Sequence, residues 1–478
     1  MDSLSGQSAR HRPHTDRPSS RISIMASPPA SYLVIGGSGF LGQNLVKALV
    51  ARYPNAAVAA TDIERRHEPA GYTFHPADLT DAESLARVLR ETAATVVFHT
   101  ASPRVGSSRA VCELVNVRGT ENVVAACRTA GVRTLVYTSS ASVVFDGADL
   151  VHVDERLSVD PAEGAKFFDV YAETKARAET VVLKANDPAG LRTVALRPAG
   201  IFGPGDGQLI PPLMEILRKR QTRFQLGSNR NLFDWTYVDN LVDAHLLAAE
   251  RIDATVPRER LGERTPPVEL TLQRRALPTS VFRVDGQFLD DEERDDLATS
   301  ASGHKTEGGG ASDVDGALFA TRNRLDQFSR TGVEGAGEDI AAPMRVAGQA
   351  FFITNGEPLP FWDICRMIWF EYNGHVPPQP YWALPRSLAG VFARAAEAFG
   401  YITGREVTFK LPKVILSCAR RYYNIERARI LLGYEPKIGV REGIKRHVAV
   451  RLLELLDALT ITVVQGAGSG RQGAVSVH

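Results

Sequence analysis

The chain has 478 residues, a formal net charge of +1, and globular proportions of hydrophobic and charged residues, 44% and 23%. This composition excludes collagen-like, wholly disordered and many-span membrane proteins, and the balanced charge gives no field that would recruit nucleic acid. The cysteines are too far apart in sequence for a metal knuckle or a disulfide framework, so we expect no metal site and a reducing compartment. They are Cys112, Cys127, Cys365 and Cys418.

Short apolar runs alternate with amphipathic segments from Ser31 to about residue 250. The expected strands and helices alternate along the chain. This alternation predicts a Rossmann-type α/β domain over 31–250, with a doubly wound parallel sheet. The expected strands are 32–35, 57–62, 72–75, 95–99, 133–139 and 191–197. The first expected helix begins near Phe40, and three further helices are expected at 82–91, about 110–130 and 169–187.

The remaining segments have other compositions. Residues 1–30 are rich in Ser, Arg, His and Pro and lack the apolar core of a secretory signal, so we expect a disordered tail rather than a transit peptide. Residues 251–346 are polar, glycine-rich and without periodicity, which predicts a disordered insertion, either genuine or an artefact of the gene model. Periodicity resumes with an expected strand at 349–354, within a smaller substrate-binding region at 347–458. Residues 459–478 are a second expected tail.

A glycine-rich loop joins the first expected strand to the first expected helix, and residues 36–42 read Gly-Gly-Ser-Gly-Phe-Leu-Gly. One glycine suits a tight turn, one lets backbone approach a pyrophosphate, and one lets the helix pack on the strand. The start of the helix offers free N–H groups to the phosphates. The loop therefore predicts a dinucleotide site that includes Gly36, Gly39, Phe40, Leu41 and Gly42.

Asp62, at the end of the second expected strand, could accept hydrogen bonds from the adenosine ribose and would repel a 2′-phosphate, which favours NAD. Arg65 and Arg66 could instead bind that phosphate, so NADP stays open, although a solvated loop is the simpler interpretation. Asp78 and Leu79, after the third expected strand, are expected to flank the adenine, unless Asp78 merely caps the next helix.

Tyr171 and Lys175 are spaced to share one face of a helix. A nearby ammonium lowers the pKa of a phenol, so Tyr171 could take a proton from a hydroxyl near neutral pH. This spacing alone is weak evidence, but Ser139 and Ser140 end the preceding expected strand, at the ligand edge of such a sheet. We expect Ser140, or alternatively Ser139, to bond the reacting oxygen; simple turn chemistry is the other interpretation.

Together these residues resemble the extended short-chain dehydrogenase/reductases. The shared features are the glycine loop, the strand-end serines, the Tyr171/Lys175 pair and the segment 197–205, Arg-Pro-Ala-Gly-Ile-Phe-Gly-Pro-Gly. Within that superfamily the chain is most similar to the 3β-hydroxysteroid dehydrogenase family. The similar segments are 98–103, 116–123, 234–240 and 353–362, and the resemblance covers about 31–250 and 347–456.

The resemblance implies roles for individual residues. Tyr171 would be the general base, Lys175 its partner and a ribose ligand, and Ser140 the partner of the substrate hydroxyl. Asn116 would support the active-site helix, although a cap or a buried amide is as good an interpretation. Pro198 would lie against the cofactor. His99, which ends the fourth expected strand, is more simply a structural histidine than an acid.

The resemblance also implies a reaction: NAD(P)-dependent oxidation of the 3β-hydroxyl of a 4α-carboxysterol to a 3-ketone, with loss of CO2, in sterol biosynthesis. A β-keto acid loses CO2 readily, so no metal is needed. The alternatives are a steroid dehydrogenase/isomerase, a nucleotide-sugar epimerase or dehydratase, and a non-catalytic nucleotide-binding protein.

Membrane association is a further expectation. A stretch after Pro385 repeats apolar residues at helical spacing and could be a substrate lid, a bilayer-interface helix or a core helix. By resemblance alone we expect the cytoplasmic face of the endoplasmic reticulum membrane, other sterol C4-demethylation proteins as partners, and a possible homodimer. The apolar residues are Trp382, Leu384, Leu388, Val391, Phe392, Ala395 and Phe399, among Arg386, Arg394 and Glu397.

Overall fold

The computed structural model describes residues 31–66, 70–104, 106–256, 275–277, 318–320, 344–378, 381–405, 407 and 409–453. Its centre is a seven-stranded sheet with the strand order β16-β7-β5-β4-β1-β2-β3, in which every pairing is parallel. This confirms the predicted fold class. The strands are β1 (Ser31–Ile35), β2 (Ala57–Asp62), β3 (Thr73–Pro76), β4 (Val96–His99), β5 (Thr134–Thr138), β7 (Arg192–Pro198) and β16 (Ala350–Ile353).

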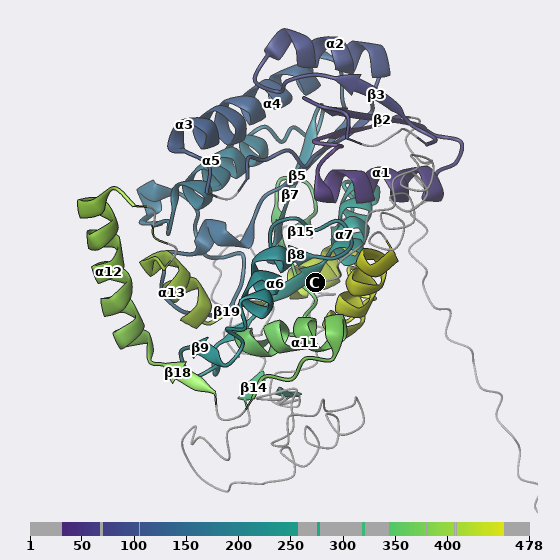
Figure 1. Ribbon diagram of the computed structural model, residues 1–478. Coiled ribbons are helices and arrows are strands. Elements are labelled where there is room, and N and C mark those ends of the chain that lie inside the picture. The colour runs from purple at the N-terminus through teal and green to yellow at the C-terminus, as the bar shows by residue number, and fades with distance from the viewer. Residues whose placement is uncertain are drawn as a thin grey trace, which may run out of the picture.

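Helices cover both faces of this sheet because its strands bury alternate residues on opposite sides. In β1, Tyr32 and Val34 belong to one apolar cluster, and Leu33 and Ile35 to the other. The first cluster includes α1 (Phe40–Arg52) and α7 (Val238–Glu250). The second includes α2 (Ala82–Thr92), α4 (Gly119–Thr129) and α5 (Val170–Lys184), which lie together in Figure 1.

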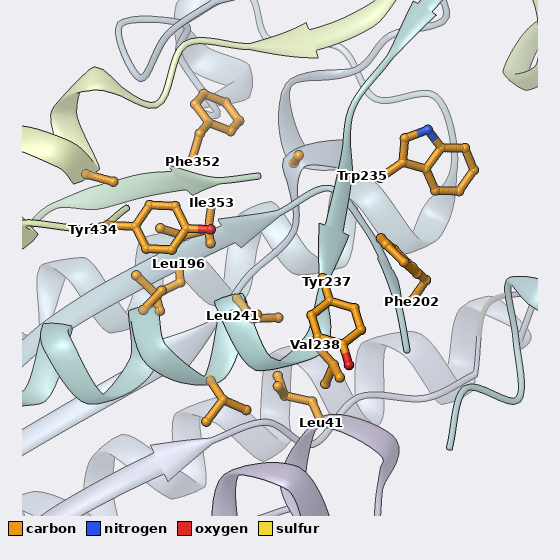
Figure 2. Packing of buried hydrophobic residues seen from close by; sticks show 14 of the residues in the cluster. Leu41, Leu196, Phe202, Trp235, Tyr237, Val238, Leu241, Phe352, Ile353 and Tyr434 are labelled. Carbon is orange, nitrogen blue, oxygen red and sulfur yellow. The ribbon is translucent and has the colours of Figure 1, made fainter. Parts of the chain in front are cut away.

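The helix α7 fills the space between the sheet and α1. Figure 2 shows Val238 and Leu241 of α7 between Leu41 of α1 and the sheet residues Leu196 and Ile353. All five side chains are buried. Full burial of one such side chain stabilises the fold by roughly 1.5–3 kcal/mol, so this layer fixes the start of α1 against the sheet.

The C-terminal part of the chain completes the sheet and adds smaller units beside it. The edge strand β16 pairs with β7, Ile353 opposite Pro198. A second sheet has the order β17-β10-β19-β6, formed by β17 (Leu359–Pro360), β10 (Leu232–Phe233), β19 (Arg421–Tyr423) and β6 (Leu150–Val153). Further elements are β8 (Gly200–Phe202) with β11 (Trp235–Tyr237), β9 (Phe224–Leu226) with β18 (Trp382–Leu384), α3 (Arg109–Cys112), α6 (Ile210–Arg218), α11 (Phe361–Asn373), α12 (Arg386–Thr403), α13 (Leu411–Cys418), and a helix from 440 to at least 453.

The predicted limits of the insertion are wrong at both ends. The strands β12 (Thr255–Val256) and β15 (Met344–Arg345) pair antiparallel, and Ile252 and Val346 beside them are buried. A second antiparallel pair, β13 (Arg275–Leu277) and β14 (Leu318–Ala320), lies between these ends. The rest of the predicted insertion and the predicted tails lie outside the described residues.

The apolar stretch after Pro385 is not a core helix. Trp382 and Leu384 lie in β18, and the helix α12 exposes Leu388 and Phe392 by more than half. Its contact with α13 uses small residues instead. Among the described residues we find no helix that combines the length and the apolar character of a membrane span.

Candidate active site

The glycine loop forms a cradle that side chains would fill. Gly36 has φ +84°, and a Cβ on it would lie 2.6 Å from the backbone nitrogen of Ala101. A Cβ on Gly42 would lie 2.1 Å from the carbonyl oxygen of Gly36, so α1 begins directly against β1. Gly39 is the N-cap and offers no side-chain bond to the helix. The free N–H groups of the first turn thus remain for an anion, and the residues fit a dinucleotide pyrophosphate.

Asp62 lies beside this loop, at the end of β2. Its Oδ2 accepts from the Ser38 N–H at 3.1 Å and its Oδ1 from the Ile63 N–H at 2.8 Å. Burial raises the pKa of Asp62, and these two backbone bonds oppose the shift. The carboxylate is therefore held at the loop with lone pairs left for a ribose hydroxyl. Arg66 forms an exposed ion pair with Glu64, at 3.8 Å.

Asp78 and Leu79 lie in the turn after β3. Asp78 accepts from the N–H and the hydroxyl of Thr80, both at 2.8 Å, whereas Asp81 caps α2. The capping interpretation of Asp78 is therefore wrong. The Leu79 carbonyl accepts from Asn122 of α4 at 3.1 Å, which ties the turn to the helix layer.

Lys175 belongs to α5, and its buried side chain reaches the end of β5. Asp169 caps α5, so Tyr171 lies in the first turn of the helix and Lys175 one turn later. The Lys175 ammonium donates to the Thr138 carbonyl and lies 4.4 Å from the centre of the Tyr137 ring. Burial lowers the pKa of Lys175 to about 7, against an opposing effect of Glu179. Burial therefore disfavours the charged form of Lys175, and Glu179 partly offsets that effect.

The buried His245 positions Thr138, the residue whose carbonyl accepts from Lys175. His245 Nδ1 contacts the Leu241 carbonyl at 2.8 Å, so this nitrogen is assigned the proton, and Nε2 accepts from the Thr138 hydroxyl at 2.7 Å. Burial lowers the pKa of His245 to about 4, which keeps the ring neutral. Sequence reasoning missed this pair, because 107 residues separate Thr138 from His245.

The predicted lowering of the Tyr171 pKa is not observed. Burial raises this pKa, a hydrogen bond with the Ser102 hydroxyl opposes the shift, and Lys175 is not among the groups that affect it. None of the hydrogen bonds in the described part of the chain joins Tyr171 to Lys175 or Ser140. The Lys175 ammonium donates instead to the Thr138 carbonyl, and Ser140 pairs with Ser142.

The two strand-end serines differ in their surroundings. Ser140 Oγ lies 2.8 Å from Ser142 Oγ and accepts from the Ser142 N–H at 3.2 Å, as the cap of a short 3-10 helix. Ser139 is buried, and its hydroxyl has no hydrogen-bond partner among the described residues. Ser140 is the more accessible of the two, since it is only half-buried.

Asn116 connects the strand β4 edge to the helix α5. It lies in a π-helical turn, Glu113–Arg118, and donates through Nδ2 to Thr174 Oγ1 at 3.0 Å. Its Oδ1 accepts from the Ser102 hydroxyl at 3.2 Å. Ser102 thus contacts both Asn116 and Tyr171. Sequence reasoning did not assign Ser102 a role, although a hydroxyl just past the end of β4 was a usable signal.

His99 and Pro198 complete the predicted set. His99 is buried, contacts Thr120 Oγ1 at 3.0 Å, and has its pKa lowered to about 3 by burial and by the charge of Lys175. A neutral ring in this position fits the structural interpretation. Pro198 ends β7 at the carboxyl edge of the sheet. Within the described ranges, no cluster of three or more His, Cys, Asp or Glu side chains could hold a metal ion.

Known proteins resemble the chain over nearly its whole length. The sequence profile of the 3-beta hydroxysteroid dehydrogenase/isomerase family matches residues 33–265. The decarboxylating sterol-4-alpha-carboxylate 3-dehydrogenase of Saccharomyces cerevisiae is 34% identical, covering 88% of this chain and 97% of the yeast protein. The Schizosaccharomyces pombe enzyme of the same name is 36% identical over the same shares.

The chain belongs to the 3β-hydroxysteroid dehydrogenase/isomerase family. The human decarboxylating sterol-4-alpha-carboxylate 3-dehydrogenase is 32% identical, over 87% of this chain and 86% of the human protein. The predicted family is therefore confirmed, and with it the prediction of an oxidoreductase scaffold that uses a nicotinamide cofactor.

Solved structures agree on the fold. A protein named gox2253 superposes with a TM-score of 0.57 at 18% identity, over 89% of this chain and 98% of its own. The UDP-glucose 4-epimerase of Thermus thermophilus, solved with NAD, gives a TM-score of 0.52 at 19% identity, over 88% and 98%. At these identities the likeness concerns the fold alone.

Proposed function

We propose that this protein oxidises the 3β-hydroxyl of a 4α-carboxysterol to the 3-ketone with NAD, and that the product loses CO2. The observation that carries the proposal is similarity to decarboxylating sterol-4-alpha-carboxylate 3-dehydrogenases across both the nucleotide loop and the C-terminal part of the chain. A likeness confined to the loop would support only nucleotide binding, because many unrelated functions share this fold.

The side chains around the end of β5 suit this oxidation. A bound nicotinamide supplies the hydride acceptor. Tyr171 would receive the hydroxyl proton at Oη, and the hydroxyls of Ser140 and Ser102 would orient the substrate oxygen. Lys175 uses one donor on the Thr138 carbonyl and keeps its others for a ribose hydroxyl and the phenol. Its charge then helps to stabilise a phenolate that burial alone disfavours.

Loss of CO2 needs no further side chain. Oxidation at C3 places a ketone β to the C4 carboxylate. When the bond between C4 and the carboxylate carbon breaks, its electron pair passes to the ketone oxygen through an enolate, CO2 leaves, and the enolate takes a proton. The residues of the site therefore only have to complete the oxidation.

The preference for NAD rests on Asp62. Its carboxylate lies at the position where the adenosine ribose binds in this fold, so a 2′-phosphate would meet a like charge. Arg66, which could offset that charge, forms its ion pair with Glu64.

The test incubates the purified full-length protein with a 4α-carboxysterol and either NAD or NADP. We expect NADH formation, with a sterol product lighter by the mass of CO2 and of two hydrogens. The same sterol without its 4-carboxyl group should lose two hydrogens only. Turnover of UDP-glucose instead, or no sterol product with either nucleotide, would overturn the proposal.

We further propose that the enzyme works at the cytoplasmic face of the endoplasmic reticulum membrane, beside other enzymes of sterol C4-demethylation. The support for this location is chemical, because the sterol substrate would reach the enzyme from a lipid bilayer. Fractionation of cells that express a tagged chain tests this: recovery in the soluble fraction alone would contradict it.

A further inference from the structure

A cation of the C-terminal part of the chain lies beside the turn that carries Ser140. This turn, the Ser140 turn, runs from Ser140, the cap of a short 3-10 helix, to Phe145. Near its start the Tyr423 hydroxyl donates to the Ala141 carbonyl at 3.4 Å. At its end the guanidinium carbon of Arg421 lies 4.3 Å from the centre of the Phe145 ring. Two side chains of β19, two residues apart, therefore face the Ser140 turn together.

The guanidinium of Arg421 contacts a second aromatic ring. Phe233 of β10 is the partner of Arg421 in the second sheet, and its ring centre lies 5.2 Å from the guanidinium carbon. Aromatic rings attract a guanidinium group and fix its plane. A guanidinium bound in this way through its face keeps its N–H edge for an oxygen acceptor.

Arg421 forms no ion pair with any described side chain. Its Nε is buried and lacks a hydrogen-bond partner among the described residues. Burial raises the pKa of Tyr423, and the charge and a hydrogen bond of Arg421 oppose the shift. The acids at neighbouring strand ends bind other groups, since Asp149 pairs with Arg420 at 3.6 Å and Asp234 accepts from the Tyr423 N–H at 2.8 Å. A half-buried cation without an anion is costly, so this arginine indicates an anion that comes from outside the fold.

The contacts of the Ser140 turn connect this cation with the proposed base. The ring of Phe145 lies 5.0 Å from the ring of Phe168, and the Phe168 N–H donates to the Phe145 carbonyl at 2.8 Å. Phe168 stands just before α5, whose first turn carries Tyr171. The Ser140 turn thus contacts both Arg421 and the segment that leads into the helix of Tyr171.

We propose that Arg421 binds the carboxylate at C4 of the sterol and makes the enzyme select carboxylated sterols. The hydroxyl at C3 and the carboxylate at C4 are on adjacent ring carbons. A sterol whose hydroxyl meets Ser140 and Tyr171 therefore presents its carboxylate to the same wall of the site. A guanidinium and a carboxylate match in two parallel N–H···O bonds. This inference rests on the proposed function for the identity of the substrate.

The pair between Arg421 and the carboxylate forms when the substrate binds, before the oxidation. An interaction that is equally strong in the bound substrate and in the transition state lowers KM and leaves kcat unchanged. Arg421 is thus a specificity-determining residue, and its effect should depend on whether the sterol carries the carboxyl group.

The test compares, in the full-length protein, a 4α-carboxysterol with the same sterol without its carboxyl group. Arg421→Met keeps a long side chain against the two rings but removes the charge and the donors. We expect kcat/KM for the carboxysterol to fall by about 100-fold, mainly through KM. For the carboxyl-free sterol it should change by less than about threefold. Arg421→Lys, which keeps the charge without the paired donors, should recover part of the loss.

Arg420→Met is the matched control. Arg420 is the preceding residue and forms its ion pair with Asp149 at the exposed surface, so its loss should leave both sterols unaffected. An equal loss for both sterols in Arg421→Met would assign Arg421 a structural role and overturn the proposal. So would an unchanged kcat/KM for the carboxysterol, or binding of UDP-glucose that Arg421→Met abolishes.

Sterol binding, measured by the quenching of tryptophan fluorescence, separates this proposal from the proposed reaction. The natural protein should bind the carboxysterol more tightly than the carboxyl-free sterol, and Arg421→Met should bind the two alike. Oxidation of neither sterol would contradict the proposed reaction alone. Equal affinities of the natural protein for the two sterols would contradict the role of Arg421.

Discussion

In the seven-stranded sheet the large apolar side chains, such as Leu33 and Phe352, are fully buried. In α12 the large apolar side chains face solvent, and the buried residues are the small Ala389, Ala393 and Gly400. Both segments have strong apolar periodicity in sequence. The comparison teaches that periodicity identifies an apolar face but not its partner. In the sheet that partner is a layer of helices; for α12 it lies outside the described fold.

The first prediction is that catalysis depends on residues at the central sheet and not on the exposed helix α12. Tyr171→Phe should lower kcat by about 10³-fold, because the phenol oxygen that receives the proton is lost. Binding of the nicotinamide cofactor, measured by fluorescence titration, should be retained. Tyr401→Phe, at a 92% exposed tyrosine of α12, is the matched control and should leave kcat unchanged. Full turnover by the Tyr171 variant would exclude this residue as the base.

A second prediction compares the two regions by stability. Phe352→Ala should lower the free energy of unfolding by about 4 kcal/mol, because it opens a cavity in the core. Phe392→Ala should change it by less than about 0.5 kcal/mol, since more than half of that residue is already exposed to water. Chemical denaturation of both variants measures these effects. A similar loss in both would mean that Phe392 is packed rather than exposed.

A third prediction concerns pH. Asp234, between β10 and β11, is fully buried and accepts from the Tyr423 N–H at 2.8 Å. Burial raises its pKa from 3.8 to about 7. The folded state therefore holds this proton more tightly than the unfolded state does. The stabilisation is complete below about pH 4 and is lost as the pH rises through about 7.

The loss amounts to roughly 4 kcal/mol. Asp234→Asn keeps an acceptor for the Tyr423 N–H but cannot titrate. Denaturation series between pH 4 and pH 8 should show a smaller decline in stability for this variant than for the natural protein. Parallel curves for the two would show that Asp234 has an ordinary pKa.

The smallest predicted effect is on cofactor choice. Asp62→Asn removes the charge that a 2′-phosphate would meet but keeps an acceptor for the ribose. The ratio of kcat/KM for NAD to that for NADP should fall by about tenfold, or about 1.4 kcal/mol. An unchanged ratio would assign the selectivity to another residue. Glu64→Gln, in the neighbouring exposed loop, is the control for a general change of surface charge.

Much of the fold was predictable because its signals are local. The predicted strand at 57–62 coincides with β2, and the predicted helix 82–91 differs from α2 by one residue. The glycine loop and Asp62 lie together as predicted, because a tight turn and a strand end fix them. The π-helical turn around Asn116 was missed, since its one extra residue leaves no mark in an apolar pattern.

The sequence by itself determined the alternation of strands and helices, the cradle at Gly36 and Gly42, and the presence of an apolar face on α12. Only the tertiary structure decided that Lys175 bonds the Thr138 carbonyl, that His245 holds Thr138 from 107 residues away, and that the α12 face turns outward. The physical reason is range. Turns, caps and periodicity act over a few residues, whereas the partner of a buried polar group or of an apolar face is set by how distant elements pack.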